Sequence, residues 1–209
     1  MTASIVTFTN QIGAGGSLVA RATAAKLRYR YYDWEVISQA AAEAGVSPEV
    51  VAVATAERAP SFLERMMKRL AGPEEAPVAA SGPRLSILAS DDYRQFIEHV
   101  VQELASRGDA VIVGHAAQAI LRDRASVLRV LIHAGNESRI ARVRQLTHST
   151  EEEARKTIED ADKQRSAFFN RVYHIDWLNA RTYDLTLSTD RVSIELAKDM
   201  IVAAAREVP

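Results

Sequence analysis

A glycine-rich turn between a short apolar segment and a helical segment constrains the fold of this chain more than any other feature. Residues 4–9 are apolar and β-branched, which predicts a strand, and residues 17–27 carry apolar side chains near helical spacing. The turn between them reads Gly13, Ala14, Gly15, Gly16. Glycine takes positive φ freely and lets backbone N–H groups approach a ligand. Because a helix that begins there also directs unpaired N–H groups at the same point, the turn predicts an anion site, typically for phosphate.

The same turn matches part of the P-loop pattern G-x-x-x-x-G-K-[ST]. Gly15 is the second glycine, and Ser17 stands where the pattern has the hydroxyl that binds Mg²⁺. Asn10 replaces the first glycine and Gly16 replaces the lysine, which normally brings positive charge to the β- and γ-phosphates. Either another cation substitutes, or turnover is slow, or the site only binds. A tight strand-to-helix turn without a ligand is the alternative interpretation.

Strands and helices alternate along the chain, which predicts an α/β fold of the P-loop NTPase class. We expect a mainly parallel five-stranded sheet, covered by helices on both faces, in a single domain of residues 1–209. The expected strands are 4–9, 30–33, 109–114, 127–133 and 183–188. The expected helices are 17–27, 35–45, two between 47 and 70, 91–107, 116–123, 137–147, 151–172 and 192–206. Residues 72–83 are rich in Pro, Ala, Gly and Ser and predict a mobile loop.

Composition excludes several classes of function. The net charge of -1 gives the molecule no basic field to attract nucleic acid. The chain has no cysteine, which excludes disulfides, thiolate catalysis and cysteine-bound zinc. The N-terminus lacks the features of a signal peptide, and the longest mainly apolar run, 110–121, is too short to span a bilayer. We therefore expect a cytoplasmic protein that binds neither nucleic acid nor membrane.

Arginine residues after the fourth expected strand are candidates to replace the missing lysine charge. Arg139 and Arg142 are three positions apart and share a helix face. Asp162 and Arg165 have the same spacing on the next helix. Phosphoryl transfer requires converging cations because charge spreads over the oxygens of the transferred group. These four residues are therefore the candidate catalytic residues, and solvated helix faces that pair with acidic neighbours are the alternative.

Asp33 and His115 each follow an expected strand, at the edge where open α/β sheets bind ligands. We expect both residues to bind substrate there, Asp33 by orienting an acceptor or by contacting a metal through water. A helix cap is the alternative role of Asp33. A structural histidine with satisfied hydrogen bonds is the alternative for His115.

Taken in order, these motifs resemble the cytidylate kinase-like family, relatives of bacterial cytidylate kinase among the nucleoside monophosphate kinases. The resemblance covers most of the chain and rests on segments 5–17, 31–33, 111–114, 130–142, 162–165, 174–177 and 183–189. It implies ATP and Mg²⁺ as cofactors, with donor phosphates held by the glycine turn. It also implies that Arg139 or Arg142, and Arg165 in an Asp-x-x-Arg motif, contact phosphates from a lid, and that Asp33 lies at the acceptor edge. Many of these kinase-like sequences have glycine at the position of Gly16.

The resemblance further implies a helical acceptor-site insert at residues 46–90 and a lid-like helical segment at residues 136–174. This chain departs from the family after the third strand, where cytidylate kinases have Gly-Arg-Asp and this chain has Gly114-His115-Ala116. A histidine that is mostly neutral at pH 7 thus replaces the acceptor-side arginine. The arginine that precedes Asp-x-x-Arg in cytidylate kinases is also missing, with Ile158 and Glu159 in that region.

The function that the resemblance implies is ATP-dependent phosphoryl transfer to a nucleoside monophosphate. One alternative is a nucleotide-binding module with little or no catalysis, which the departures at Gly16 and His115 motivate. Another is a kinase of a different small metabolite on the same fold. An apolar stripe within residues 62–70 could pack in the local core or against a second subunit, so a homodimer stands as a hypothesis.

Overall fold

The structure, a computed structural model, describes residues 3–33 and 91–208, apart from the side chains of Asp91, Asp92, Tyr93 and Phe96. Five strands form one sheet in the order β2-β3-β1-β4-β5. Each neighbouring pair in this sheet is parallel, as predicted. The strands are β1 Ile5–Asn10, β2 Arg30–Tyr32, β3 Ala110–Val113, β4 Val127–His133 and β5 Leu185–Ser188.

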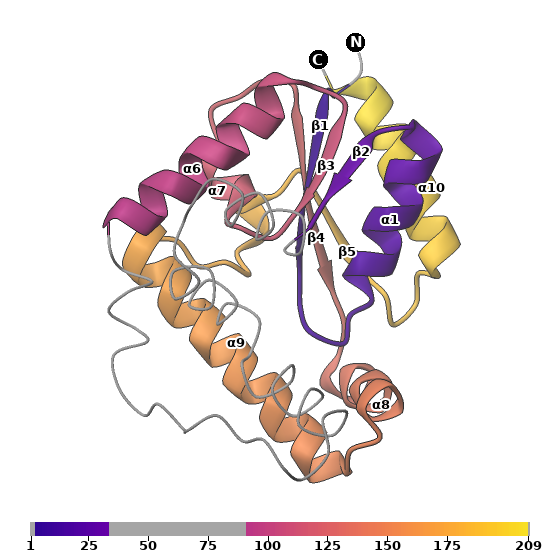
Figure 1. Cartoon of the computed structure of the whole chain (residues 1–209). Helices are drawn as coiled ribbons and strands as arrows, with labels where there is room; N and C mark the ends of the chain where they lie inside the picture. The colour runs from indigo at the N-terminus through magenta and orange to yellow at the C-terminus, as the bar shows by residue number, and fades with distance from the viewer. Residues whose placement is uncertain (1–2, 34–90, 209) are drawn as a thin grey trace, which may run out of the picture.

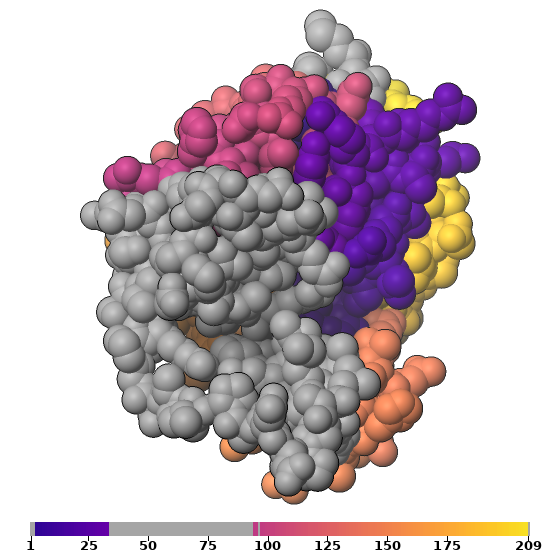
Figure 2. Space-filling view, viewed as in Figure 1, coloured from indigo at the N-terminus to yellow at the C-terminus, as the bar shows by residue number. Residues whose placement is uncertain are grey.

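Helices cover both faces of the sheet (Figure 1), which also confirms the prediction. On one face, α1 (Gly16–Leu27) and α10 (Ile194–Glu207) pack over Val6 and Phe8 of β1. On the other face, α6 (Asp91–Ser106) and α7 (Ala117–Ile120) pack over Ile5. The space-filling view shows the N-terminal segment (indigo) between α6 (magenta) and α10 (yellow) (Figure 2). Alternate side chains of β1 thus point into two separate apolar layers, because successive strand residues face opposite ways.

The strands at the centre of the sheet are largely apolar because they are buried on both faces. All four residues of β3 are buried, and so are the first five of β1. Parallel strands covered on both sides have this nearly continuous apolar composition. Since all five strands run the same way, the residues that follow them gather at one edge of the sheet, and this carboxyl edge is where the candidate site residues lie.

Two further helices, α8 (Asn136–Thr147) and α9 (Glu151–Tyr173), lie beyond the carboxyl edge of the sheet (Figure 1). A small apolar cluster joins them, and Ile12 of the glycine turn packs against it. The other members are Ile140, Val143, Ala154 and Ile158. The helical pair is therefore attached to the turn itself as well as to the end of β4.

Three differences from the predicted elements have local causes or lie outside the described residues. The last strand begins at Leu185 instead of 183, because Tyr183 ends a short 3-10 turn, Ala180–Thr182, and its hydroxyl donates to Trp177 O at 2.5 Å. Helix α7 is shorter than predicted and ends at Ile120. The predicted helices at 35–45 and 47–70 and the loop at 72–83 lie outside the described residues. Within the part of the chain that the structure describes, no helix is long and apolar enough to cross a membrane.

Candidate functional site

The glycine turn has a backbone that only glycine adopts easily at two positions. Gly13 has φ 79° and Gly15 has φ 75°, both in the left-handed region. At Gly13, a Cβ atom would lie 2.7 Å from the carbonyl oxygen of Arg139. The turn therefore passes so close to the start of α8 that no side chain fits there.

Helix α1 begins directly at this turn, with Gly15 as its N-cap residue. Among the described residues no side chain caps this end of α1, and its first turn contains no acidic residue. Unpaired N–H groups and the helix dipole make such an end favourable for an anion. Ser17, the second residue of α1, is half-buried beside it. The geometry of residues 13–17 thus fits a phosphate group.

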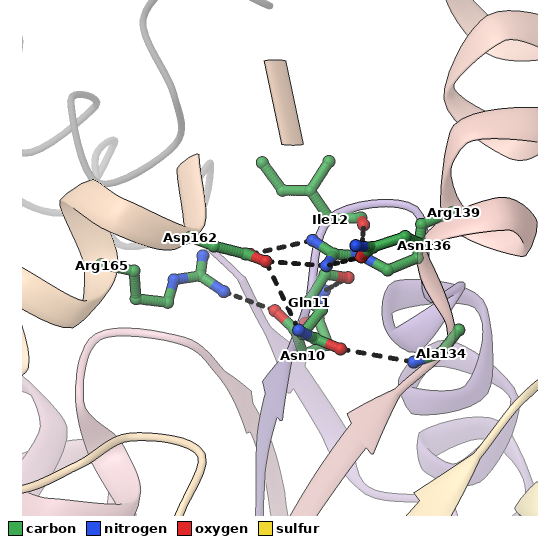
Figure 3. A network of polar contacts seen from close by, with 8 residues as sticks. All are labelled: Asn10, Gln11, Ile12, Ala134, Asn136, Arg139, Asp162 and Arg165. Atoms are coloured by element: carbon green, nitrogen blue, oxygen red, sulfur yellow. Dashed lines mark hydrogen bonds and ion pairs between the residues drawn. The ribbon is translucent and has the colours of Figure 1, made fainter. Parts of the chain in front are cut away.

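Arg139 of α8 and Asp162 of α9 meet beside Ile12 of the turn (Figure 3). The guanidinium group donates two hydrogen bonds to the carboxylate, at 2.7 and 2.8 Å, and its Nε donates to Ile12 O at 2.7 Å. Arg139 Nη1 also lies 3.4 Å from Asn136 Oδ1. Arg139 is 1% exposed. One buried side chain therefore connects α8, α9 and the glycine turn.

Gln11 extends this network across the end of β1. Its Nε2 lies 3.5 Å from Asp162 Oδ2, and its Oε1 accepts from Ala134 N at 3.4 Å (Figure 3). Gln11 is buried, so both ends of its amide require partners. Through these contacts the end of β1 is tied to α9 on one side and to the end of β4 on the other.

Arg142, one helical turn after Arg139, fixes the other part of the turn. Its Nη1 donates to Gly13 O at 3.2 Å and to Thr189 Oγ1 at 2.8 Å, and its Nη2 donates to Thr189 O at 2.7 Å. The Thr189 hydroxyl in turn donates to Ala14 O at 2.8 Å. Thr189 follows β5 and is buried. The end of β5 and the glycine turn are therefore joined through one hydroxyl and one guanidinium group.

Arg165 of α9 approaches the turn at its first residue. Its Nη1 donates to the backbone oxygen of Asn10, and its guanidinium carbon lies 5.1 Å from the ring centre of Trp177. Trp177 is 1% exposed and stacks on Phe169 at 6.4 Å. The aromatic stack thus supports one face of the guanidinium group, a cation–π arrangement. We call Arg139, Arg142 and Arg165 the arginine collar, because their guanidinium groups donate to carbonyl oxygens of the turn.

Asp33 and His115 form a second group at the carboxyl edge. Asp33 accepts from Arg21 Nη2 at 2.7 Å. His115 is 4% exposed, and burial lowers its pKa from 6.5 to about 4, an effect that the charge of Asp33 partly opposes. The imidazole is therefore neutral at pH 7, and it brings no positive charge to this part of the edge.

The backbone at His115 is unusual for a residue that carries a side chain. Gly114, His115 and Ala116 have φ values of 80°, 56° and 53°, three consecutive residues in the left-handed region. Such conformations are uncommon outside glycine and cluster at functional sites. The turn brings the histidine into the protein interior directly after β3.

The four arginine and aspartate residues predicted from sequence therefore lie together around the glycine turn, and Asp33 and His115 lie near one another. The sequence interpretation gave no role to Gln11 or Thr189. Thr189 could have been found by the same reasoning as Asp33 and His115, because it also follows a strand and so lies at the carboxyl edge. Nothing in the sequence indicates that the collar bonds to carbonyl oxygens of the turn.

A divalent cation would find few protein ligands here. Within residues 3–33 and 91–208, no group of three or more His, Cys, Asp or Glu side chains could hold a metal ion. The Ser17 hydroxyl can be one ligand, and Mg²⁺ characteristically takes most of its ligands from phosphate oxygens and water. The residues present thus fit Mg²⁺ bound together with a nucleotide rather than alone.

Comparison with known proteins gives a family match and several similar folds. The model of the cytidylate kinase-like family matches residues 5–191. An uncharacterized protein from Eubacterium ventriosum has a similar structure, with a TM-score of 0.66 and 20% identity over 96% of this chain and 97% of that one. Shikimate kinase from Bacteroides thetaiotaomicron has a TM-score of 0.53 and 14% identity, over 96% of this chain and 97% of that one. Shikimate kinase from Acinetobacter baumannii, in complex with shikimate, has a TM-score of 0.50 and 15% identity, over 96% of this chain and 92% of that one. No curated protein matches the chain. The structural matches support the α/β P-loop fold and, at these identities, nothing more.

Proposed function

The chain belongs to the cytidylate kinase-like family, and from this we propose that it transfers a phosphoryl group from ATP to a nucleoside monophosphate. The observation that carries the proposal is the glycine turn itself. No side chain caps its helix end among the described residues, the first turn of α1 has no acidic residue, and a collar of three arginine residues surrounds its carbonyl side. An anion at the turn would be attracted both by N–H groups and by nearby positive charge.

The donor nucleotide would occupy residues 13–17. The backbone N–H groups of Gly13, Gly15 and Gly16 would contact its phosphates, and the Ser17 hydroxyl would be a ligand of the accompanying Mg²⁺. Ala14 would line the site through its position in the turn, because its own N–H donates to Gln11 O at 3.0 Å. When bound, ATP supplies the phosphoryl group. Transfer forms a bond between an acceptor oxygen and the γ-phosphorus and breaks the bond from that phosphorus to the bridging oxygen, which leaves with ADP.

The collar residues and Asp162 form the proposed catalytic group, in which Arg139 and Asp162 position the turn while Arg142 and Arg165 act on the phosphates. Arg139 is buried and paired with Asp162 and with Ile12 O, which suits it to hold the turn in shape. Arg142 and Arg165 are half-buried, so their guanidinium groups are nearer to a ligand at the turn. Positioning and electrostatics supply most of the rate in phosphoryl transfer, and therefore no general base is required of this chain.

We assign the lid to residues 136–174 and the acceptor insert to residues 46–90, within one domain of 1–209. Helices α8 and α9 make up nearly all of this lid and pack on each other and on Ile12, whereas the insert lies outside the described residues. A lid that closes over the site would exclude water from the transferred group. Because the lid carries all three collar arginines, its position would also set the positive charge around the phosphates.

The acceptor would lie near Asp33 and His115. A monophosphate acceptor requires positive charge at its own phosphate, and His115 is neutral at pH 7 because burial lowers its pKa to about 4. This observation favours a second candidate function, a kinase of a small metabolite that offers a neutral hydroxyl group. The two candidates share the donor site and differ in what fills the acceptor site.

ADP formation with different acceptors tests the proposal. The protein is mixed with ATP, Mg²⁺ and, in turn, CMP, dCMP, UMP, AMP or a panel of hydroxyl-bearing metabolites, with an ATP-only reaction as the reference. Acceptor-dependent ADP identifies the acceptor class. Ser17→Ala should remove the Mg²⁺-dependent reaction, whereas Ser106→Ala, an exposed serine at the end of α6, should leave it unchanged.

Two negative results have different meanings. If no acceptor yields ADP while ATP still raises the thermal midpoint, the chain is either a nucleotide-binding module without catalysis or a kinase of an acceptor outside the panel. If no ADP forms and ATP does not raise the thermal midpoint, the assignment of the glycine turn as a phosphate site is wrong.

A further inference from the structure

Asn10 and Gly16, at the two ends of the glycine turn, compete for one space. A Cβ atom at Gly16 would lie 2.3 Å from the Cβ and 2.7 Å from the Cγ of Asn10. Non-bonded carbon atoms pack at about 3.5–4.0 Å. The clash involves the first atom of the Asn10 side chain, which no rotation about χ1 can move. Only one of the two positions can therefore carry a side chain while the backbone keeps this shape.

The backbone on both sides of this contact is held in place. Asn10 is the last residue of β1, in register with Ile132 of β4, and its carbonyl oxygen accepts from Arg165. Gly16 is buried at the start of α1, directly after the left-handed Gly15. Separating the two residues would require β1 or α1 to move, and both are packed in the core of the sheet.

The identities at these two positions are the reverse of the P-loop pattern. The pattern has glycine at the position of Asn10 and lysine at the position of Gly16. We propose that Asn10 takes the space of the lysine side chain, so that it excludes a lysine from the turn and leaves the phosphate charge to the arginine collar. This inference rests on the proposed function, because it concerns how the same turn binds phosphate.

The charges around the turn agree with such an exchange. Residues 10–17 contain neither lysine nor arginine. The collar guanidinium groups donate to the backbone oxygens of Asn10, Ile12 and Gly13 from beside the turn. Because Arg139 is paired with Asp162, the positive charge that the collar offers to a phosphate comes from its other two members. Asn10 is thus a positioning residue, which acts through the identity of its neighbour at position 16.

A double-mutant cycle on stability tests the steric part. The variants are Gly16→Ala, Gly16→Lys, Asn10→Gly and both Asn10→Gly combinations, measured by urea unfolding. We expect Gly16→Ala and Gly16→Lys to lose much of the stability of the wild type. In the Asn10→Gly background the same changes should cost little, a strong non-additivity that marks contact between the two positions. Leu18→Lys, at an exposed position two residues on, controls for adding a charge to α1.

If the effects of the Asn10 and Gly16 substitutions on the unfolding free energy are additive, the two positions do not compete for one space and the inference is wrong. That result is independent of any nucleotide, so it also separates this inference from the proposed function. If the wild-type protein binds no nucleotide, the proposed function fails while the stability cycle still decides whether the two positions compete.

Nucleotide binding tests the functional part. Titration calorimetry with Mg²⁺ and ADP compares Asn10→Gly with Asn10→Gly/Gly16→Lys at low and high salt. The double variant regains a lysine in the turn, so we expect it to bind ADP several-fold more tightly and to lose more affinity in salt than Asn10→Gly. Leu18→Lys should raise the affinity for ADP less, and should add less salt dependence, than the double variant does. Equal affinities of the two variants would show that the turn has no place for the lysine charge and would overturn this part.

Discussion

Arg139 and Asp162, 23 positions apart, form a two-bonded ion pair in which Nη1 lies 2.7 Å from Oδ2 and Nη2 lies 2.8 Å from Oδ1. The remaining Nε donates to Ile12 O in the glycine turn. Paired N–H···O bonds of this kind fix orientation as well as distance. Since Arg139 is on α8 and Asp162 on α9, any movement of α9 relative to the turn must break or carry this pair. The position of α9 and the shape of the turn are thus coupled through Arg139.

Removing Arg139 should break the ion pair and destabilise the protein. Arg139→Ala removes the donor to Ile12 O and, among the described residues, leaves Asp162 with only the 3.5 Å contact from Gln11 Nε2. Breaking a buried pair costs about 3 kcal/mol, somewhat less here because Asp162 is 29% exposed. Arg144→Ala is the matched control, since Arg144 on the same helix is 49% exposed and 3.9 Å from Glu151. The control should change stability by less than about 0.5 kcal/mol. Urea unfolding measures both, and equal losses would contradict the structural role of the pair.

The hydroxyl of Thr189 should matter more than its methyl group. Thr189→Val keeps the shape but removes the bond to Ala14 O and the acceptor for Arg142 Nη1, each 2.8 Å long. Leaving such buried groups unpaired costs about 2 kcal/mol, and the less ordered turn should bind ADP more weakly. Thr189→Ser retains the hydroxyl and should stay close to the wild type in both urea unfolding and ADP titration. A serine variant as weak as the valine variant would contradict this assignment.

Gly13 should tolerate alanine less well than another glycine with a similar backbone. Gly13→Ala meets both the left-handed φ of 79° and the Arg139 carbonyl oxygen 2.7 Å from the new Cβ. Gly108→Ala has a φ of 64° but no atom closer than 3.9 Å. The backbone conformation costs about 1–2 kcal/mol at each position, and overpacking adds about 1–3 kcal/mol at Gly13 alone. The difference between the two unfolding free energies therefore measures how closely the turn approaches α8.

Burial of His115 should make the protein less stable in mild acid. Its pKa is lowered from 6.5 to about 4 in the folded state, mainly by burial. The unfolded chain therefore binds more protons between these values, so the contribution to stability is complete above pH 6.5 and is lost as pH falls toward 4. The difference of 6.5 minus about 4 corresponds to about 3 kcal/mol at 1.36 kcal/mol per pH unit.

A neutral replacement isolates this contribution. His115→Gln cannot take up a proton, so its unfolding free energy should fall less than that of the wild type between pH 6.5 and pH 4. His99→Gln is the control, because the His99 side chain is 78% exposed, and it should follow the wild-type curve. If His115→Gln has the same pH dependence as the wild type, His115 is not the group responsible.

Most of the described fold was predictable because strands and helices here have distinct sequence patterns. The buried strand β3 is a continuous apolar run, and β1 ends where the glycines begin. Parallel pairing then follows from the alternation of strands with helices. The start of β5 was predicted two residues early because Tyr183 is apolar enough to extend a strand, but its hydroxyl is bonded to Trp177 O.

The sequence predicts which residues gather at the candidate site better than it predicts the contacts that they make there. Helical spacing brought Arg139 and Arg142 to one face, and a strand end marked Asp33. Spacing does not show that a guanidinium group turns toward the carbonyl oxygens of a loop more than 100 residues earlier in the chain, as Arg139 does to Ile12 O with a separation of 127. The clash between Asn10 and Gly16 likewise depends on backbone geometry that no pattern of residue types contains.

Arg165 should affect catalysis far more than folding. Its guanidinium group is half-buried between Asn10 O and the Trp177 ring, contacts worth about 1 kcal/mol to stability. As a cation beside the proposed phosphate site, it should contribute roughly 100-fold to turnover, as single preorganised donors do. Arg165→Ala should therefore lower kcat for acceptor-dependent ADP formation with little change in urea unfolding.

Arg165→Lys, which keeps the charge but loses the planar group that stacks on Trp177, should recover only part of the rate. Arg171→Ala, at an exposed position near the end of α9, should retain full activity. An unchanged kcat in Arg165→Ala would remove Arg165 from the catalytic residues and leave it as a support of the turn.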